Sequence, residues 1–291
     1  MHVDLQIDRP IFIVGSGRSG TTILYNILCG HPDLAWFSNH SQRWPRYPQV
    51  AWLSWLYTVE SLRRRSPRGL PIPAEAHAVW DYCKPVLDSP GDPPLTEADV
   101  TPEAEACIRK IVGQYIRYQG KSRFINKNTR NSRRIRFLNR IFDDALFIHV
   151  IRDPRATINS FLEVGFWPDL KIWCCDKITP REWEGQGRDP VILAARLWMK
   201  NVQRVLEDRA VLGKDRYIEV RYEDFMARPD DVLAALLDFA GLRWNDRFRS
   251  FASTFTLKSM NFKYKARFSE EQLAEIKRVV QPLAGSLGYD W

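Results

Sequence analysis

Long apolar runs are missing from this sequence, and so is a recognisable leader. No stretch of the 291 residues approaches the roughly 18–20 consecutive apolar residues that span a bilayer. The first residues, MHVDLQIDRP, carry neither a basic nor an apolar region, so they do not resemble a signal peptide. We therefore expect a cytoplasmic protein.

Cysteine is scarce, and the spacing of the cysteines does not match metal-ligand pairs. The five are Cys29, Cys83, Cys107, Cys174 and Cys175. An odd number without a metal-binding pattern fits a reducing compartment. The adjacent Cys174 and Cys175 allow two interpretations, a redox-active pair or an inert pair, and we favour the inert pair.

Repeats and low-complexity tracts are also absent, and the composition is that of an ordinary globular protein. Hydrophobic residues make up 45% and charged residues 27%. We expect a single domain over residues 1–291. The net charge of +8 suggests an anionic ligand or surface. No nucleic-acid recognition motif accompanies this charge, so we do not expect nucleic-acid binding.

Strands and helices alternate along the chain. Short segments rich in β-branched and aromatic residues predict strands at 10–14, 34–37, 123–126, 146–151 and 216–221. Apolar residues at helical spacing predict helices at 191–207 and 231–240. The alternation predicts an α/β fold, with a central, mainly parallel five-stranded sheet between helices in three α/β/α layers. Ligands of such sheets bind at the carboxyl ends of the strands.

Two irregular segments interrupt the alternation. Residues 38–100 are rich in Trp, Pro and basic residues, and residues 161–190 contain three tryptophans. Loops of such length in a compact domain are more often lids or binding loops than plain connectors. We expect both to be helical or irregular insertions that cover the acceptor site.

A Gly-rich loop follows the first strand, in PIFIVGSGRSGTTILYNILCGHPD (10–33). Gly15 and Gly20 fit the P-loop spacing G-x-x-x-x-G-K-[ST], but Thr21 replaces the lysine and the nearby cation is Arg18. Loop N–H groups, the helix N-terminus and the hydroxyls of Thr21 and Thr22 predict a phosphate site. The alternative is a glycine-rich turn without a ligand. The missing lysine argues against ATP.

The stretch LFIHVIRDPRATINSF (146–161) repeats this arrangement. A buried strand ends at Arg152, Asp153 can cap a helix, Pro154 suits its first turn, and Ser160 lies two turns along it. Arg152 and Ser160 can meet at a second anion, although Arg152 alone could equally pair with a carboxylate. Two anion sites at two strand ends suggest a nucleotide with phosphates on both sides of its ribose.

These residues resemble the sulfotransferases that use 3′-phosphoadenosine 5′-phosphosulfate (PAPS). GSGRSGTT (15–22) resembles their 5′-phosphosulfate loop, in the Arg-containing form of bacterial and tyrosylprotein-type members, and RDPRATINS (152–160) resembles their 3′-phosphate motif. Weaker matches are HPDL (31–34), NKNT (126–129), VRYEDFMARPDDVL (220–233) and the final LGYDW. The resemblance implies that the nucleotide is bound by Gly17, Arg18, Ser19, Gly20, Thr21, Thr22, Arg152, Ser160 and Tyr222.

The resemblance also implies the reaction. A sulfuryl group would move from PAPS to a hydroxyl, or less readily an amine, by in-line displacement, releasing 3′,5′-ADP. Arg18 and Lys127 would stabilise the transfer without a metal ion, by analogy with phosphoryl transfer. Two of these residues could instead have no functional role: Lys127 could be an ordinary solvated lysine, and Tyr222 could be an ordinary core tyrosine. Lys263 or Lys265 would approach the 3′-phosphate, but a solvated charge run explains them equally well.

The general base is expected shortly after the HP motif, where relatives carry Glu or His. Here WFSNHSQRW places Asn39 and His40 in that window. An amide cannot accept the proton, so His40 is the candidate, since its ordinary pKa suits the task. A structural His40 is the alternative. We expect His149 to belong to the core and His31 to support a turn.

The acceptor is open among small molecules, glycans and lipids. Residues 121–140 hold eight basic and no acidic residues. We interpret Arg133, Arg134, Arg136 and Arg140 as a solvated face rather than an anion-attracting rim. Residues 50–65 carry two Trp and an Arg run, which suits peripheral membrane contact or a lipidic acceptor, but a helix packed over the sheet is the favoured interpretation.

Two rival functions remain at this stage. A P-loop kinase with a degenerate lysine predicts ATP and Mg²⁺ binding, and it lacks a convincing Walker-B Asp. A non-catalytic nucleotide-binding module predicts PAPS binding without transfer.

Overall fold

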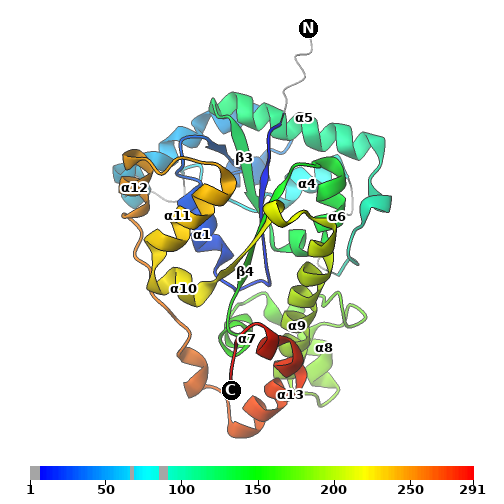
Figure 1. Cartoon of the computed structure of the whole chain (residues 1–291). Helices are drawn as coiled ribbons and strands as arrows, with labels where there is room; N and C mark the ends of the chain where they lie inside the picture. Colours follow the sequence, from blue (N-terminus) through cyan, green and yellow to red (C-terminus); the bar gives the residue numbers. More distant parts are fainter. Residues whose placement is uncertain (1–6, 66–68, 85–90) are drawn as a thin grey trace.

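A parallel sheet forms the centre of the protein, whose computed structural model describes residues 7–65, 69–84 and 91–291. The strands are β1 (Ile11–Val14), β2 (Leu34–Ala35), β3 (Arg123–Lys127), β4 (Leu146–Ile151) and β5 (Tyr217–Arg221). Their order in the sheet is β2-β3-β1-β4-β5, and every pairing is parallel (Figure 1). The predicted α/β fold and its five strands are confirmed.

Helices cover both faces of the sheet. Side chains alternate along β1, so Ile11 and Ile13 join one core cluster while Phe12 and Val14 join the other. The cluster that contains Phe12 includes residues of α4 (His77–Cys83), α5 (Pro102–Gln119) and α6 (Ile135–Ile141). The cluster that contains Ile13 includes residues of α1 (Thr21–Leu28), α10 (Tyr222–Ala227), α11 (Pro229–Ala240) and α12 (Asp246–Ala252). This is the predicted three-layer α/β/α arrangement.

A third cluster of helices lies beyond the carboxyl edge of the sheet, toward the C-terminus in Figure 1. It comprises α7 (Pro154–Leu162), α8 (Pro180–Gly185), α9 (Pro190–Asp208) and α13 (Glu270–Ser286), which share a separate apolar core. The predicted helices at 191–207 and 231–240 correspond to α9 and α11. Helix α11 ends at Gly241, whose φ of 66° lies in the left-handed region that favours glycine.

The remaining elements are short. They are the helices α2 (Asn39–Arg43) and α3 (Glu60–Arg65) and the 3₁₀ helices η1 (Pro48–Thr58), η2 (Glu97–Asp99), η3 (Thr129–Arg133), η4 (Trp167–Asp169), η5 (Arg209–Val211), η6 (Lys214–Arg216) and η7 (Lys263–Ala266). Parts of the predicted insertion, at 66–68 and 85–90, lie outside the described residues. Among the residues that are described, no helix is long and apolar enough to cross a bilayer.

One expectation about local structure is corrected, and one feature was not anticipated. The predicted helix at 50–65 is a 3₁₀ run followed by the short α3, and it packs on α5 and α1 rather than over the sheet. The unanticipated feature is a disulfide between Cys83 and Cys107, whose Cα atoms are 5.4 Å apart. Their separation of 24 residues gave no local signal for the pairing.

His149 belongs to the core, as expected, and it makes stability depend on pH. Burial, together with Arg209, lowers the pKa of His149 from 6.5 to about 3. Between these values the unfolded chain binds one more proton than the native state, so acidification below about pH 6.5 lowers the free energy of unfolding. Chemical denaturation at pH 7 and pH 5 should show the wild type losing about 2 kcal/mol more than His149→Gln. Equal losses in the two proteins would contradict this assignment.

Candidate functional site

The loop between β1 and α1 follows a path that demands glycine. Gly15 has φ of 145°, and a Cβ there would lie 2.3 Å from the carbonyl oxygen of Val150 on the neighbouring strand. The Ser132 hydroxyl donates to the Gly15 carbonyl over 2.7 Å and accepts from its N–H over 2.8 Å. At Gly20, with φ of 86°, a Cβ would collide with the ring of Tyr222. The loop is thereby fixed against β4 and α10.

The N-terminus of α1 has no side-chain cap among the described residues. Its N-cap residue is Gly20, and its first turn contains no acidic residue. The first N–H groups of a helix lack intrahelical partners and attract negative charge. The hydroxyl of Ser19, buried beside this turn, has no hydrogen-bond partner among the described residues. Thr21 and Thr22 begin the helix and line the space beyond it.

The two anion motifs are joined by direct hydrogen bonds. Arg18 donates from Nε to the Ser160 hydroxyl over 3.0 Å, and Arg152 donates from Nη1 to the Arg18 carbonyl over 2.9 Å. The Arg152 guanidinium also lies over the Tyr222 ring, 4.3 Å from its centroid. Arg18 itself has φ of 69°, an uncommon value for a residue with a side chain. The sequence suggested that both motifs serve one ligand, and the structure places them in contact.

A second set of contacts orients Arg152 from the C-terminal part of the chain. Arg152 donates from Nε to the Asn261 side-chain oxygen over 2.8 Å, and the Asn261 amide donates to Glu223 over 2.6 Å. Glu223 also accepts from the Tyr289 hydroxyl over 2.9 Å. Asp153 caps α7 by accepting from the Arg155 N–H over 2.8 Å, as the sequence predicted for this position. The guanidinium is therefore held before any ligand arrives.

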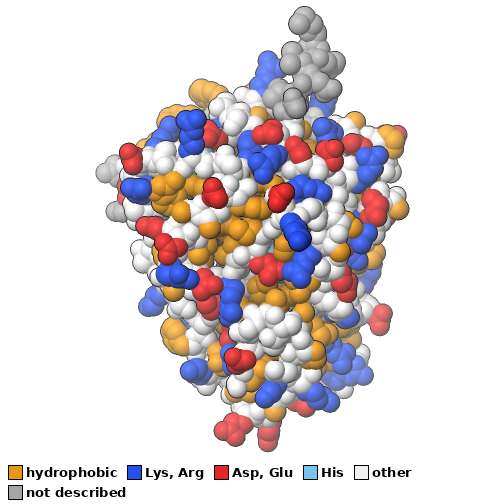
Figure 2. Space-filling model, viewed as in Figure 1, with side chains coloured by type: hydrophobic (Ala, Val, Ile, Leu, Met, Phe, Trp, Pro, Cys, Tyr) orange, Lys and Arg blue, Asp and Glu red, His pale blue; other side chains and the backbone are white. Residues whose placement is uncertain are grey.

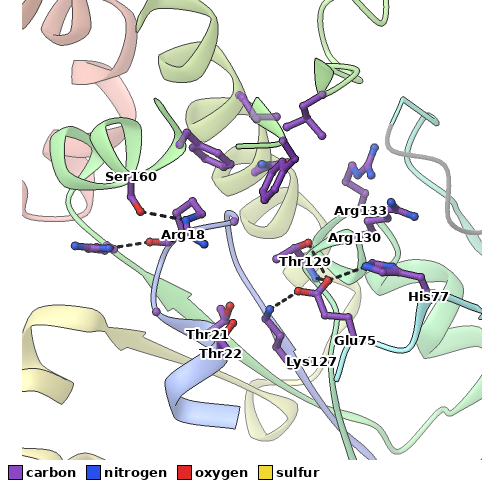
Figure 3. A pocket seen from close by; sticks show the side chains of 18 of the residues that line it. Arg18, Thr21, Thr22, Glu75, His77, Lys127, Thr129, Arg130, Arg133 and Ser160 are labelled. Carbon is purple, nitrogen blue, oxygen red and sulfur yellow. Dashed lines mark hydrogen bonds and ion pairs between the residues drawn. The ribbon is translucent and has the colours of Figure 1, made fainter. Parts of the chain in front are cut away.

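A cavity of about 980 Å³ opens over these elements (Figure 3). Sheet register explains why the strands contribute to it: Lys127 is the last residue of β3 and pairs with Ile13, while β4 ends immediately before Arg152. The carboxyl ends of β3, β1 and β4 thus meet at its floor. Of the residues predicted to bind nucleotide or act in catalysis, its wall contains Gly17, Arg18, Gly20, Thr21, Thr22, Lys127, Arg152, Ser160 and Tyr222.

An acidic side chain that sequence reasoning missed lies beside Lys127. One carboxylate oxygen of Glu75 forms an ion pair with the Lys127 ammonium, and the other lies 3.3 Å from His77 Nε2. The second oxygen also accepts from the N–H and hydroxyl of Thr129, each over 3.3 Å. Burial by itself raises the pKa of Glu75, but Lys127 and His77 outweigh burial and hold that pKa well below its usual range. Figure 3 shows the carboxylate pointing into the cavity.

Asn39 explains how Glu75 reaches this position. The Asn39 side chain donates to the Leu70 carbonyl and accepts from the Ile72 N–H, each over 3.0 Å. These two bonds hold the extended segment 70–75 beside α2, so the segment delivers Glu75 to the end of β3. In the window where the sequence suggested a general base, Asn39 therefore has a positioning role.

Three predicted site residues do not line this cavity. His40 packs its ring against Trp44, with centroids 5.8 Å apart, and burial lowers its pKa. Lys263 is exposed on η7, and the segment approaches Arg152 through Asn261 instead. Ser19 is buried under the loop. His31, as expected, supports its turn: its ring accepts from the Asp33 N–H over 3.2 Å.

The basic segment after β3 is solvated only in part: Arg140 is exposed, as expected, and Arg136 is half-buried, but Arg133 and Arg134 are buried. Arg133 and Arg134 are 7% and 4% exposed. The segment that includes Asp92 contacts Arg133, which donates to the Asp92 carbonyl over 2.5 Å and stacks on the Trp173 ring at 5.4 Å. Arg130 and Arg133 line the cavity on the same side of Glu75 as His77, away from Ser160 (Figure 3).

Figure 2 shows how charged side chains are distributed on one face of the molecule. There Lys and Arg side chains are interspersed with Asp and Glu rather than gathered in one basic patch.

Comparisons with known proteins identify the family of this chain. Residues 10–246 match a model described as the sulfotransferase family. The chain is 24% identical over 243 residues to a Drosophila melanogaster protein-tyrosine sulfotransferase, covering 81% of this chain and 38% of that protein. It is 25% identical over 259 residues to the Mycobacterium tuberculosis omega-hydroxy-beta-dihydromenaquinone-9 sulfotransferase Stf3, covering 81% and 63%. The chain thus spans less than two thirds of either relative.

Solved structures show the same fold. The Mycobacterium avium sulfotransferase STF9 superimposes with a TM-score of 0.64 at 16% identity, covering 99% of this chain and 79% of that one. The sulfotransferase domain of the curacin biosynthetic pathway gives a TM-score of 0.54 at 17% identity, covering 98% and 99%. Because the family model matches most of its length, this chain belongs to the sulfotransferase family.

Proposed function

We propose that this protein transfers a sulfuryl group from PAPS to a hydroxyl group of an acceptor, with release of 3′,5′-ADP. One observation carries the proposal. Two anion-binding motifs, bonded to each other through Arg18, Arg152 and Ser160, line the same cavity as the Glu75–Lys127 pair. A nucleotide with phosphates on both sides of its ribose fits such an arrangement, and a single phosphate does not need it.

The residues present fit PAPS. Arg152 and Ser160 would hold the 3′-phosphate, and the loop N–H groups with Thr21 and Thr22 would hold the 5′-phosphate. Ser19 supplies a buried hydroxyl without a partner next to this loop. The ring of Tyr222, already stacked under Arg152, would contact the adenine.

PAPS supplies a sulfuryl group joined to a phosphate that can leave. In the transfer, a bond forms between the acceptor oxygen and sulfur, the bond between sulfur and the bridging oxygen breaks, and the acceptor proton goes to Glu75. Arg18 and Lys127 would stabilise the negative charge that develops on the departing phosphate. An anion held against Lys127 competes with Glu75 for the ammonium, and this raises the basicity of the carboxylate.

Glu75 replaces His40 in this proposal because it lines the cavity and contacts the catalytic cation. His77 and Thr129 contact one carboxylate oxygen of Glu75, and these contacts fix the orientation of the carboxylate. An oriented carboxylate within reach of the acceptor is the arrangement that general-base catalysis needs.

The acceptor enters from the side of the cavity that faces Glu75. Trp173, on whose ring Arg133 stacks, gives this side an apolar surface, and Arg130 and Arg133 give it positive charge. A small molecule, a glycan or a lipid with a hydroxyl group suits these walls. The relatives are named for protein tyrosine and for an omega-hydroxy menaquinone, and both names fit a hydroxyl acceptor.

Sulfur-labelled PAPS tests the proposal. We expect the label to move into one or more members of a panel of phenols, sugars, long-chain alcohols and fractionated cell extract, with an equal amount of 3′,5′-ADP formed. Binding of 3′,5′-ADP without transfer to any of them would favour the non-catalytic nucleotide-binding module. Stabilisation by ATP and Mg²⁺ alone would favour the kinase.

A further inference from the structure

Exposed large apolar side chains are concentrated in one part of the chain. Seven of the nine that occur among the described residues fall between residues 44 and 82: Trp44, Tyr47, Trp52, Trp55, Leu62, Ile72 and Tyr82. Of these nine residues, only Phe166 lines the cavity described above. Single exposed apolar residues need no explanation, but a concentration of aromatic ones marks a contact surface.

The geometry of η1 presents two of these aromatics side by side. In a 3₁₀ helix, residues three apart eclipse one another. Along η1, Pro48, Ala51, Ser54 and Tyr57 form a buried row. The row that begins one residue later contains Trp52 and Trp55, which are 65% and 53% exposed. The two indoles thus project from one edge of a helix that is anchored in the core along its neighbouring, buried row.

The sequence that carries these tryptophans contains basic residues and no acidic ones. Residues 34–59 contain no Asp or Glu, and their two cations are Arg43 and Arg46. The Arg43 guanidinium lies 5.2 Å from the Trp44 ring centroid, and that of Arg46 lies 5.6 Å from the Tyr82 centroid. Trp and Tyr beside basic residues are the side chains enriched where proteins meet the headgroup region of a bilayer.

A groove of about 370 Å³ adjoins this surface and carries two cations. Arg46 and Lys110 line it together with Tyr82 and one residue of the disulfide, Cys107. The disulfide joins Cys107 on α5 to Cys83 at the end of α4, which keeps the two walls of the groove together. Two basic side chains in a shallow groove suit a phosphate-bearing headgroup.

We propose that Trp44, Tyr47, Trp52, Trp55, Tyr82, Arg46 and Lys110, the interfacial surface, bind the face of an anionic phospholipid bilayer. Trp52 and Trp55 enter the boundary between headgroups and acyl chains, and Arg46 and Lys110 contact lipid phosphates. The inference stands independently of the sulfotransferase activity. Helix α4 connects the two regions, since His77 at its start lines the cavity and Tyr82 near its end belongs to the interfacial surface.

Vesicle sedimentation with the full chain tests this surface. We expect binding to vesicles of phosphatidylcholine with phosphatidylglycerol, weaker binding to phosphatidylcholine alone, and weakening of the former by salt. The double variant Trp52→Ala/Trp55→Ala should lower the affinity at least about tenfold. Phe262→Ala, which removes a 59% exposed aromatic outside the interfacial surface, should bind as the wild type does.

Two arginine variants form a second test, which separates the effect of charge from that of apolar contact. Arg46→Gln should lower the affinity for anionic vesicles about fivefold, whereas Arg278→Gln, on the exposed side of α13, should not. Melting temperatures close to the wild type show that each variant folds. The proposal is overturned if the wild type does not bind anionic vesicles or if the tryptophan variant binds equally well. It is also overturned if ultracentrifugation shows a dimer that this variant dissociates, because a second copy then occupies the surface.

Discussion

Glu75→Gln lowers turnover about a hundredfold to ten-thousandfold while the affinity for 3′,5′-ADP stays close to that of the wild type. Glutamine keeps the size of the side chain and can still accept hydrogen bonds from Thr129, but it cannot accept the acceptor proton. Among the described residues, the side-chain partners of Arg152 and Ser160, which are assigned to the 3′-phosphate, do not include Glu75, and Lys127, which pairs with Glu75, keeps its charge in this variant. Steady-state kinetics with the acceptor found by the labelled-PAPS screen, together with calorimetry of 3′,5′-ADP, checks both parts.

Two control variants make this result specific. Asp169→Asn removes another carboxylate that lines the cavity; its partner is Arg181 over 3.0 Å, on the exposed rim, and turnover should change little. His40→Ala should also retain turnover, because His40 does not line the cavity. Loss of activity in His40→Ala with retention in Glu75→Gln would restore the histidine as the base and reject the role assigned here.

Arg152→Ala weakens 3′,5′-ADP binding about tenfold to a hundredfold, the cost of removing a hydrogen-bonding partner from a charged phosphate. The variant should leave the affinity for 5′-AMP nearly unchanged, since that ligand lacks the 3′-phosphate. Calorimetric titration of both ligands into both proteins forms a cycle that isolates the contact. A general distortion of the site would instead weaken the two ligands equally.

Arg155→Ala is the matched control for this cycle. Arg155 lies three residues farther along the same segment, pairs with Asp153 over 2.6 Å, and does not line the cavity. Its removal changes the charge of the chain by the same amount as removal of Arg152. Equal weakening by the two variants would show that only overall charge matters, and it would contradict a specific 3′-phosphate site.

The parts of this protein that were predictable from sequence are those with local causes. The strands are short apolar runs, and their ends place Lys127 and Arg152 at one edge whatever the rest of the chain does. The loop around Arg18 and the cap at Asp153 depend on residues within a few positions of each other. Both motifs could therefore be located from the sequence as candidate phosphate sites.

The acceptor side was not predictable because its contacts are distant in sequence. Glu75 meets Lys127 across 52 residues, and the turn that delivers it depends on Asn39, 31 residues before Leu70. A carboxylate beside a proline-rich stretch gives no local signal of such a partner. Arg133 was misjudged for the same reason, since the chain that covers it comes from around Asp92.

The prediction of a helix at 50–65 was wrong because the period of the buried residues was misjudged. Buried residues recur every three positions in η1, and over a short window this pattern overlaps with the spacing of an α-helix. The difference matters, because a three-residue period places Trp52 and Trp55 on one exposed edge.

The central claim is that one cavity binds both phosphates of a single nucleotide, and calorimetric titration of the wild-type protein with four ligands tests it most directly. We expect 3′,5′-ADP to bind with one-to-one stoichiometry and at least about tenfold more tightly than 3′-AMP or 5′-AMP. Each monophosphate lacks one of the two phosphates and therefore the hydrogen bonds that the protein makes to it. ATP with Mg²⁺ should bind more weakly than 3′,5′-ADP. Binding of 5′-AMP as tight as that of 3′,5′-ADP, or a preference for ATP with Mg²⁺, would contradict the account.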